Sequence, residues 1–320
     1  MTTFADLTSR LRVPVLASPM FIISTPDLVI AQCTAGIIGS FPALNARPQS
    51  ALRDWLKLIT VAREEHDREH PETPSAPFAV NLIVHRSNNR LEEDLATIAE
   101  FEVPIVITSL GARTDINDAV HAYGGIVLHD VIDNRFARKA VEKGADGLIA
   151  VAAGAGGHAG TQSPFALIRE IREWFAGPVL LSGAIAHGDS ILAALAAGAD
   201  LAYVGSAFIA TEEANADPAY KEMIAGSGAS DIVYSNLFTG VHGNYLRGSI
   251  EAAGLDPDNL AESDPSAMSF ATTDTDAKAW RDIWGAGQGI GPIDAVLPTH
   301  AVVERLAAEF DAARERICRL

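Results

Sequence analysis

The chain has 320 residues, of which 48% are hydrophobic and 20% are charged, so it can bury a large core. Its formal net charge of −17 and pI of about 4.8 argue against nucleic acid and anionic membrane surfaces as general partners. The sequence shows no apolar run of membrane-spanning length and no signal-type apolar core near its start. We therefore expect a cytoplasmic protein.

The cysteines give no sign of a metal or disulfide framework. Cys33 and Cys318 lie far apart and form neither a CxxC motif nor a zinc-ligand spacing. We expect two reduced structural thiols and no metal site.

Short β-rich runs recur from the N-terminus onward. Most are apolar without clear alternation, which is typical of parallel strands covered on both faces. The eight runs are Val13–Ala17, Ile37–Ser40, Phe78–Val84, Ile105–Ser109, Ile126–His129, Gly147–Ala152, Val179–Ser182 and Leu201–Val204.

Helical patterns lie between these runs, with apolar residues three and four positions apart. They cover Ala51–Arg68, Arg90–Glu100, Ile116–Tyr123, Arg135–Lys143, Pro164–Trp174 and Asp189–Ala197. Such alternation over about 200 residues predicts an α/β fold of the (β/α)8 barrel type, with an open doubly wound sheet as the alternative.

The strand–helix rhythm stops after the eighth run. From Glu212 to about Trp284, clusters of Gly, Asp, Ser and Asn replace it, and we expect a small, mostly helical lid there. The predicted organisation is a barrel over 1–211, a lid over 212–284 and a C-terminal segment over 285–320. The amphipathic helix Pro298–Arg316 in that last segment would pack back on the barrel.

A glycine-rich loop with one histidine follows the sixth run. The stretch VAAGAGGHAGTQSPF, Val151–Phe165, ends in Ser163-Pro164, which reads as a helix N-cap followed by proline at the first helical position. Glycines let a flat ligand or a phosphate approach the backbone. A histidine held there can gain or lose a proton near neutral pH, so His158 is the leading catalytic candidate.

The barrel rule places the site in the loops at the carboxyl ends of the strands. The turns after strands seven and eight, Ser182-Gly183-Ala184 and Gly205-Ser206, stand where such barrels bind phosphate. The other candidates at strand ends are Ser18, Pro19, Met20, Asn81, Ser109, His129, Gly156 and Gly157.

Taken in order, the phrases ASPM, PFAVN, GAGGHAGT, LLSGAIAHGDSILAALAAGAD, YVGSAF and WGAGQGIG resemble the nitronate monooxygenase family, formerly called 2-nitropropane dioxygenases. The resemblance runs from about Val13 to the C-terminus. It implies a TIM barrel that binds FMN without covalent attachment. The wider group includes flavin-dependent enoyl-acyl-carrier-protein reductases and NADH:quinone reductases.

The resemblance also implies roles for individual residues. Met20 and its neighbours would line the flavin ring, and Asn81 would bond its polar edge. Gly157 and His158 would face the reactive side. The phosphate would be held by Gly183, Ala184, Gly205 and Ser206, and Gln288 of the AGQ phrase would approach from the C-terminal side.

This chain departs from the family pattern at four positions. Gly154 stands where many relatives carry glutamate, and Ala184 where many have the second glycine of a pair. Ala207 replaces an arginine, and Asp130 stands where some relatives place lysine. These positions bear on the substrate more than on the flavin.

The expected activity is FMN-dependent oxidation of alkyl nitronates by dioxygen to a carbonyl compound and nitrite. His158 would act as the base for neutral nitroalkanes or, when protonated, as the partner of the nitronate charge. An NAD(P)H-dependent flavin reductase of quinones or enoyl thioesters is the main alternative. A barrel like inosine-monophosphate dehydrogenase would need a loop cysteine, and a non-catalytic flavin-binding subunit also stays open. The expected partners are a small-molecule substrate and dioxygen, and a homodimer is one open alternative for the oligomeric state.

Overall fold

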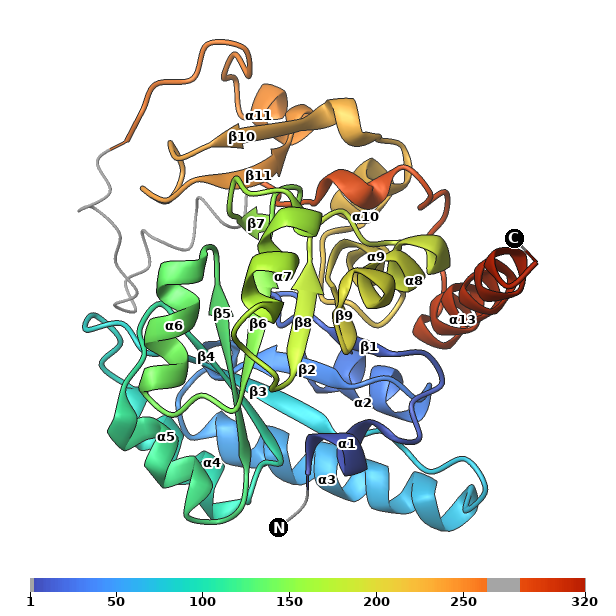
Figure 1. Ribbon diagram of the computed structural model, residues 1–320. Coiled ribbons are helices and arrows are strands. Elements are labelled where there is room, and N and C mark those ends of the chain that lie inside the picture. Colours follow the sequence, from blue (N-terminus) through green and yellow to red (C-terminus); the bar gives the residue numbers. More distant parts are fainter. Residues whose placement is uncertain (1–2, 264–282, 320) are drawn as a thin grey trace.

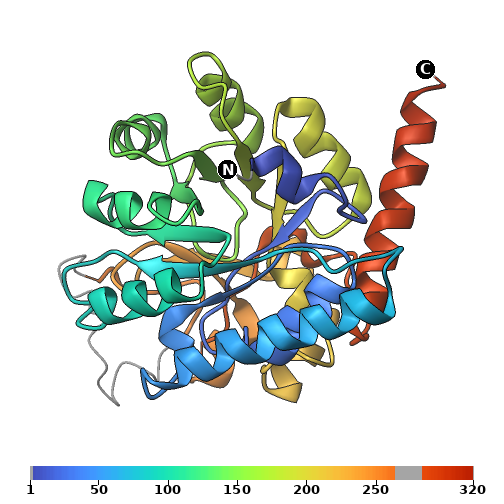
Figure 2. The ribbon, with the colours of Figure 1, turned by 90° about the horizontal axis from the view of Figure 1, so that it is seen from below.

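Eight parallel strands form the central sheet of the computed structural model, which describes residues 3–263 and 283–319. The strand order is β1-β9-β8-β6-β5-β4-β3-β2, and a parallel bridge between Leu16 and Ile38 joins the two end strands. The sheet therefore closes into a barrel (Figure 2). The strands are β1 (Val15–Ala17), β2 (Gly39–Pro42), β3 (Phe78–Ile83), β4 (Ile105–Ser109), β5 (Ile126–Val131), β6 (Gly147–Val151), β8 (Val179–Ser182) and β9 (Leu201–Val204).

The predicted (β/α)8 barrel is confirmed, and each of the eight predicted runs contains or overlaps one of these strands. Most strand ends match the predicted ones, and the others shift by one or two residues. The first strand begins at Val15 and not Val13, and the second covers Gly39–Pro42 instead of Ile37–Ser40.

Helices surround the barrel, as Figure 1 shows. None of the helices in the described segments is long and apolar enough to cross a bilayer. The helices of the ring are α2 (Pro26–Thr34), α3 (Ala51–Glu69), α4 (Leu91–Glu100), α5 (Thr114–His121), α6 (Asn134–Glu142), α7 (Pro164–Arg172), α8 (Gly188–Ala197) and α13 (Thr299–Ile317). Short helices α1 (Phe4–Thr8) and α9 (Ser206–Ile209) were not predicted from the sequence, nor was α2.

The C-terminal helix α13 completes the ring, as its amphipathic pattern predicts. It packs against α8 and α2, and Val303 and Leu306 are fully buried there. The contact with α8 is close because Gly188 has no side chain. A Cβ at that position would lie 2.1 Å from the backbone nitrogen of Phe310.

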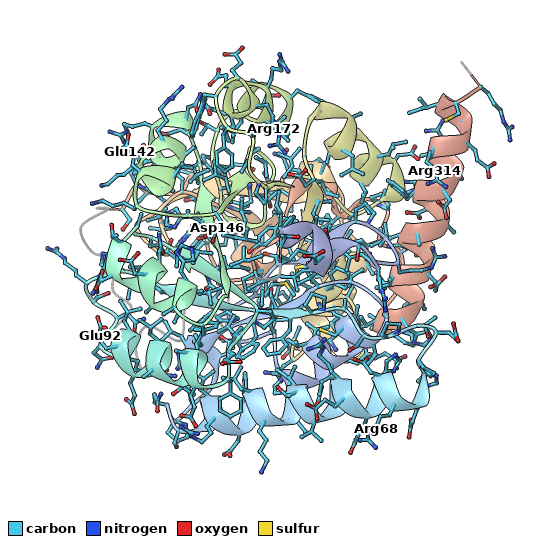
Figure 3. All side chains as sticks on the ribbon, turned by 60° about the horizontal axis from the view of Figure 1, so that its bottom comes forward. Arg68, Glu92, Glu142, Asp146, Arg172 and Arg314 are labelled. Atoms are coloured by element: carbon cyan, nitrogen blue, oxygen red, sulfur yellow. The ribbon has the colours of Figure 1, made fainter. Side chains whose placement is uncertain are left out.

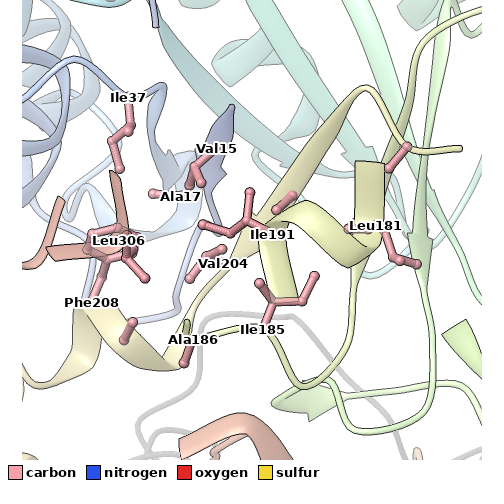
Figure 4. Packing of buried hydrophobic residues seen from close by; sticks show 14 of the residues in the cluster. Val15, Ala17, Ile37, Leu181, Ile185, Ala186, Ile191, Val204, Phe208 and Leu306 are labelled. Carbon is pink, nitrogen blue, oxygen red and sulfur yellow. The ribbon is translucent and has the colours of Figure 1, made fainter. Parts of the chain in front are cut away.

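Two apolar layers share the barrel strands. Ile107 on β4 and Leu128 on β5 point into the lumen, while Val106 and Val127 point toward the helices. Figure 4 shows part of the helix-facing layer, with Val15, Val204 and Leu306 among its members. Because both faces are buried, the strands read as continuous apolar runs. Charged side chains such as Arg68, Glu142 and Arg314 lie on the outside (Figure 3).

A second, antiparallel sheet sits at the carboxyl end of the barrel, and we call it the cap sheet. It consists of β10 (Ile232–Ser235), β11 (Gly243–Leu246) and β7 (Gly157–His158), in that order. The expected lid, residues 212–284, also contains strands that the sequence does not predict. Its described part contains α10 (Pro218–Ala225), α11 (Arg247–Ala252) and two of these strands. Residues 264–282 of the expected lid lie outside the described residues.

Candidate functional site

A cavity of about 1290 Å³ lies between the carboxyl ends of the barrel strands and the cap sheet. Ligand sites usually measure about 300–1000 Å³, so this cavity can take a ligand of mononucleotide size together with a small substrate. Nearly every residue proposed from the sequence lines it. These residues are Ser18, Pro19, Met20, Asn81, Ser109, His129, Gly156, Gly157, His158, Ser182, Gly183, Ala184, Gly205 and Ser206.

Gln288 is the exception. It is exposed, and only its neighbours Gly287 and Gly289 line the cavity. Its backbone amide donates a hydrogen bond to the carbonyl of Gly154 over 2.9 Å. In this structure Gln288 contacts the glycine-rich loop at Gly154 and is not among the residues that line the cavity.

The barrel contributes a polar floor to the cavity, which we define as Asn81, Ser109, Asp130, Ser182 and Tyr203. Each follows an inward-facing apolar residue by two positions along its strand, so each points into the top of the lumen. The inward-facing residues beneath them on the same five strands are apolar. The change from apolar to polar therefore occurs where the lumen meets the cavity.

Three members of the polar floor form a hydrogen-bonded chain. The Asn81 amide nitrogen donates to the Ser109 hydroxyl oxygen over 2.7 Å and to the Ile107 carbonyl over 3.1 Å. The Ser109 hydroxyl in turn donates to Oδ2 of Asp130 over 2.6 Å. Because a carboxylate only accepts, the direction of the chain is fixed and ends at Asp130.

Burial raises the pKa of Asp130 to about 6, against the hydrogen bond from Ser109, which favours the charged form. Burial also raises the pKa of Tyr203, whose phenol has Asp130 as a charged neighbour and Ser18 as a hydrogen-bonding one. Asp130 and Tyr203 were not among the residues proposed for the site. Counting inward-facing positions along each strand would have found both.

His129 contributes to the cavity wall, but its imidazole is committed elsewhere. It lies on the helix-facing side of β5, and its Nδ1 is 2.7 Å from the Thr108 hydroxyl. Burial lowers the pKa of His129 to about 4. The strand-end rule selected His129, whereas the next residue, Asp130, is the one that points into the lumen.

His158 is held by the cap sheet. Gly157 and His158 pair with Asn244 and Gly243 of β11, and the His158 Nε2 lies 2.9 Å from the Thr239 hydroxyl. The same hydroxyl lies 3.0 Å from the Val241 carbonyl, to which it can donate.

Burial lowers the pKa of His158 to about 4. The expectation of a histidine that titrates near neutral pH is corrected: the imidazole is neutral at pH 7. A neutral imidazole is the form that accepts a proton, so His158 is a competent base throughout the physiological range.

The glycine-rich loop lies directly on the backbone of the returning chain. A Cβ on Gly156 would lie 2.8 Å from the Gly287 nitrogen, and one on Gly287 would lie 2.7 Å from the Gly154 carbonyl oxygen. The Gly287 amide also donates to the Ser206 hydroxyl over 2.9 Å. Glycine is required on both sides because only bare backbone fits this approach.

The two turns proposed for phosphate offer unused donors. Within the described residues, the amides of Gly183, Gly205 and Ser206 donate no hydrogen bond to the protein, and all three residues line the cavity. The Ser206 hydroxyl accepts from Gly287 and keeps its own proton for donation. This set fits the phosphate of FMN. Ala184 has a φ of 55°, a region that glycine prefers, as expected where relatives carry glycine.

Two stacked aromatic rings form part of the cavity wall. Tyr220 and Trp284 stack with ring centroids 4.9 Å apart and planes 7° apart, and both line the cavity. The cations Arg47 and Lys139 line it as well. Among the described residues, no group of three or more His, Cys, Asp and Glu is placed to hold a metal ion.

Comparison with known proteins agrees with this geometry. Residues 4–309 match the nitronate monooxygenase family. A Paraburkholderia phytofirmans nitronate monooxygenase is 27% identical over 285 residues, covering 76% of each chain. A Mycobacterium tuberculosis protein described as a monooxygenase is 30% identical over 224 residues, 65% of this chain and 60% of its own length.

Among solved structures, a nitroalkane oxidase from Streptomyces ansochromogenes superposes with a TM-score of 0.78 at 24% identity, covering 97% of this chain and 99% of its own. That likeness supports the barrel. The family match covers nearly the whole chain. The chain therefore belongs to the nitronate monooxygenase family of flavin-dependent oxidoreductases.

Proposed function

We propose that the protein binds FMN and oxidises nitroalkanes and their nitronates with dioxygen, yielding a carbonyl compound and nitrite. The observation that carries this proposal is the meeting of two features in one cavity. The unused amides of Gly183, Gly205 and Ser206 lie in the same cavity as His158, whose base form is present at pH 7.

In this proposal, cofactor binding and proton transfer fall to different residues. The amides and the Ser206 hydroxyl would hold the FMN phosphate, and Asn81 of the polar floor would meet the polar edge of the flavin. When bound, FMN supplies the electron acceptor for the oxidation. The His158 imidazole would take the proton from the carbon that bears the nitro group, while the hydrogen bond to Thr239 keeps the ring oriented.

The expected lid, residues 212–284, would govern the choice of substrate and not the retention of flavin. Tyr220 and Trp284 of this segment both line the cavity, while the phosphate turns belong to the barrel. Exchange of this segment with that of a relative should change substrate preference and leave the protein yellow. Loss of flavin with unchanged preference would reverse the assignment.

The first test is the absorption spectrum of the purified protein, with FMN released on denaturation as the expected result. Anaerobic addition of nitronate should then bleach the flavin, whereas NADH and NADPH should not. Rapid bleaching by a nicotinamide with no response to nitronate would favour the reductase alternative. A colourless protein that cannot be reconstituted with FMN would contradict both.

A pH profile provides the second test. Because burial lowers the pKa of His158 to about 4, kcat/KM for a neutral nitroalkane should stay level from pH 8 down to pH 6. It should fall only as the imidazole becomes protonated near pH 4. A fall centred between pH 6 and 7 would show an ordinary histidine pKa and contradict this role for the buried ring.

A further inference from the structure

The loop that follows β1 contains a residue in a strained conformation. Ile22 has a φ of 69°, in the left-handed region that glycine prefers and that β-branched residues rarely adopt. Four residues other than glycine have a positive φ in the described part of the chain, and three of them, Ile22, Leu110 and Ala184, line the cavity. Backbone strain that clusters at a cavity points to a function of the site.

The packing of the Ile22 side chain does not account for this conformation. Within residues 3–263 and 283–319, Ile22 is neither a member of a buried apolar cluster nor packed against one. The next residue, Ile23, is buried in the core. The contacts that hold Ile22 in the left-handed region are therefore those of the loop backbone.

Asn45 supplies these contacts. It ends the short 3-10 helix η1 (Ala43–Asn45), which follows β2. The Asn45 Oδ1 accepts a hydrogen bond from the Ile22 amide over 2.9 Å. Its Nδ2 donates to the carbonyls of Met20 and Ser24, each over 2.9 Å. One side chain thus spans the turn and fixes the amide of the strained residue.

The segment that carries Asn45 is itself anchored. Arg90 donates to the Ala46 carbonyl over 2.8 Å and to the Ala43 carbonyl over 3.2 Å. Its guanidinium also donates to the Asp94 carboxylate on α4 over 3.0 Å. Because Arg90 and Asp94 are buried, water competes little for these bonds. Asn45 therefore holds the β1 loop from a fixed position.

The strained loop lies beside one of the turns proposed for phosphate. A Cβ on Gly205 would lie 3.4 Å from the Ser18 Cβ and 3.9 Å from the Met20 sulfur. Met20 and Ile22 both line the cavity. A ligand with its phosphate at Gly205 therefore has this loop as a neighbour, and the shape of the loop affects how well the ligand fits.

We propose that Asn45 is a positioning residue for the flavin: it holds Ile22 in the left-handed conformation and so keeps the β1 loop in the shape that receives FMN. A preformed loop avoids an ordering cost on binding. If only a fraction of the molecules has the competent loop, the apparent affinity falls by that fraction. The inference deepens the proposed function and rests on its FMN binding, not on its nitroalkane chemistry.

A second asparagine contacts the same residue and provides a comparison. The Asn215 side chain donates to the Ile22 carbonyl over 3.1 Å. Asn215 is exposed, so water can take over this bond when the side chain is removed. We therefore assign the positioning role to Asn45 and not to Asn215.

The test compares FMN dissociation constants, measured by titration of FMN into the apo-protein. Asn45→Ala should raise the Kd about tenfold or more, as expected when about one loop in ten keeps the competent shape. At saturating FMN, the absorption and circular dichroism of the bound flavin should move toward those of free FMN. Asn215→Ala should bind FMN within about twofold of the wild type.

Further substitutions separate the strain from a general loss of stability. Glycine adopts the left-handed conformation unaided, so Ile22→Gly combined with Asn45→Ala should return the FMN Kd to within about threefold of the wild type. Glu102→Gly relieves a φ of 47° outside the cavity and should not rescue Asn45→Ala. Asn117→Ala breaks a 2.9 Å bond to the Lys143 carbonyl, also outside the cavity, and should lower Tm without changing the FMN Kd.

An unchanged FMN Kd in Asn45→Ala, or a raised Kd that Ile22→Gly does not restore, overturns the inference. If Asn45→Ala does not fold, Asn45→Ser decides by the same titration, and an unchanged Kd overturns the inference there too. The expected pattern in a protein that oxidises no nitroalkane would overturn the proposed function and leave the inference standing. Nitroalkane oxidation with an unchanged Kd in Asn45→Ala would do the reverse, and a wild type that binds no FMN would overturn both.

Discussion

The barrel and the cap sheet are built in opposite ways. Apart from β1 and β9, which meet where the barrel closes, the barrel strands pair with neighbours that are close in sequence, and most of their residues are fully buried. In the cap sheet, β7 pairs with β11 although Gly157 and its partner Asn244 are far apart in the chain. Tyr234 on β10 is 41% exposed. Stability is therefore concentrated in the barrel, while the position of His158 depends on the cap.

The largest expected effect concerns His158 itself. His158→Ala should retain FMN, because the phosphate turns belong to the barrel, and should lower kcat/KM for neutral nitroalkanes by roughly 10²-fold or more. Turnover of preformed nitronate should fall less, since its proton is already gone. The measurement is kcat/KM for both substrate forms.

The matched control is His242→Ala, which removes a cap histidine that stacks on Tyr234 and does not line the cavity. This control should keep wild-type turnover. Equal losses for both substrate forms in His158→Ala would indicate a positioning role. No loss would remove His158 from the mechanism.

The next effect is on the barrel side of the cavity. Gly205→Asp places a carboxylate where we expect phosphate, so FMN affinity should fall by at least about tenfold in a folded protein, because like charges repel in such a site. Titration of FMN into the apo-protein measures this. Gly226→Asp adds the same charge at the end of α10, outside the cavity, and should bind FMN normally. Unchanged affinity in Gly205→Asp would mean that the phosphate lies elsewhere.

A smaller change tests the contact between β11 and β7 of the cap sheet. In Gly243→Ala the new Cβ would lie 2.7 Å from the Gly157 carbonyl oxygen, so β11 and β7 must move apart. We expect kcat/KM to fall about tenfold, as small displacements of a catalytic group do, with little change in Tm. Gly226→Ala, whose nearest contact would be 3.4 Å, is the control. A large drop in Tm with intact turnover would show that the cap carries stability instead.

A change at Gln32, on α2, should affect stability and not turnover. Both polar atoms of the Gln32 side chain, on α2, are buried without a hydrogen-bond partner among the described residues. Gln32→Met keeps the shape and removes these groups, so the free energy of unfolding should rise by about 1–3 kcal/mol with unchanged turnover. Urea denaturation measures the difference. Gln49→Met, which breaks a bond to the buried Asp94, should destabilise and serves as the contrast.

The barrel and the cap sheet also differ in how well the sequence predicts them. The barrel strands are predictable because burial on both faces leaves a continuous apolar run between helical patterns. The cap strands are short and mixed, as in Gly243–Leu246, and their pairing joins distant segments that no local pattern connects.

For the site, sequence reasoning finds the loops because they follow strands, and it places all but one of the proposed residues around a single cavity. Their chemical roles stay predictions. Sequence reasoning favours His129 over Asp130 because the strand-end rule alone does not distinguish side chains that point into the lumen from those that point toward the helices. It also gave His158 an ordinary pKa, since burial by the cap depends on contacts with residues 239–243 that the sequence does not reveal.

The way the barrel closes determines where we expect it to open locally. The join between β1 and β2 consists of one bridge, with hydrogen bonds of 2.8 Å from Ala17 to Ile38 and 3.2 Å from Ile38 to Val15, whereas β3 and β4 pair over five residues. Local opening should begin at the weakest ladder. In hydrogen exchange, the amides of Ala17 and Ile38 should lose their protons before those of Val106 and Ile107. The barrel then opens first beside Ser18 and Met20, which line the cavity. Local opening of the barrel would therefore also disturb one wall of the site.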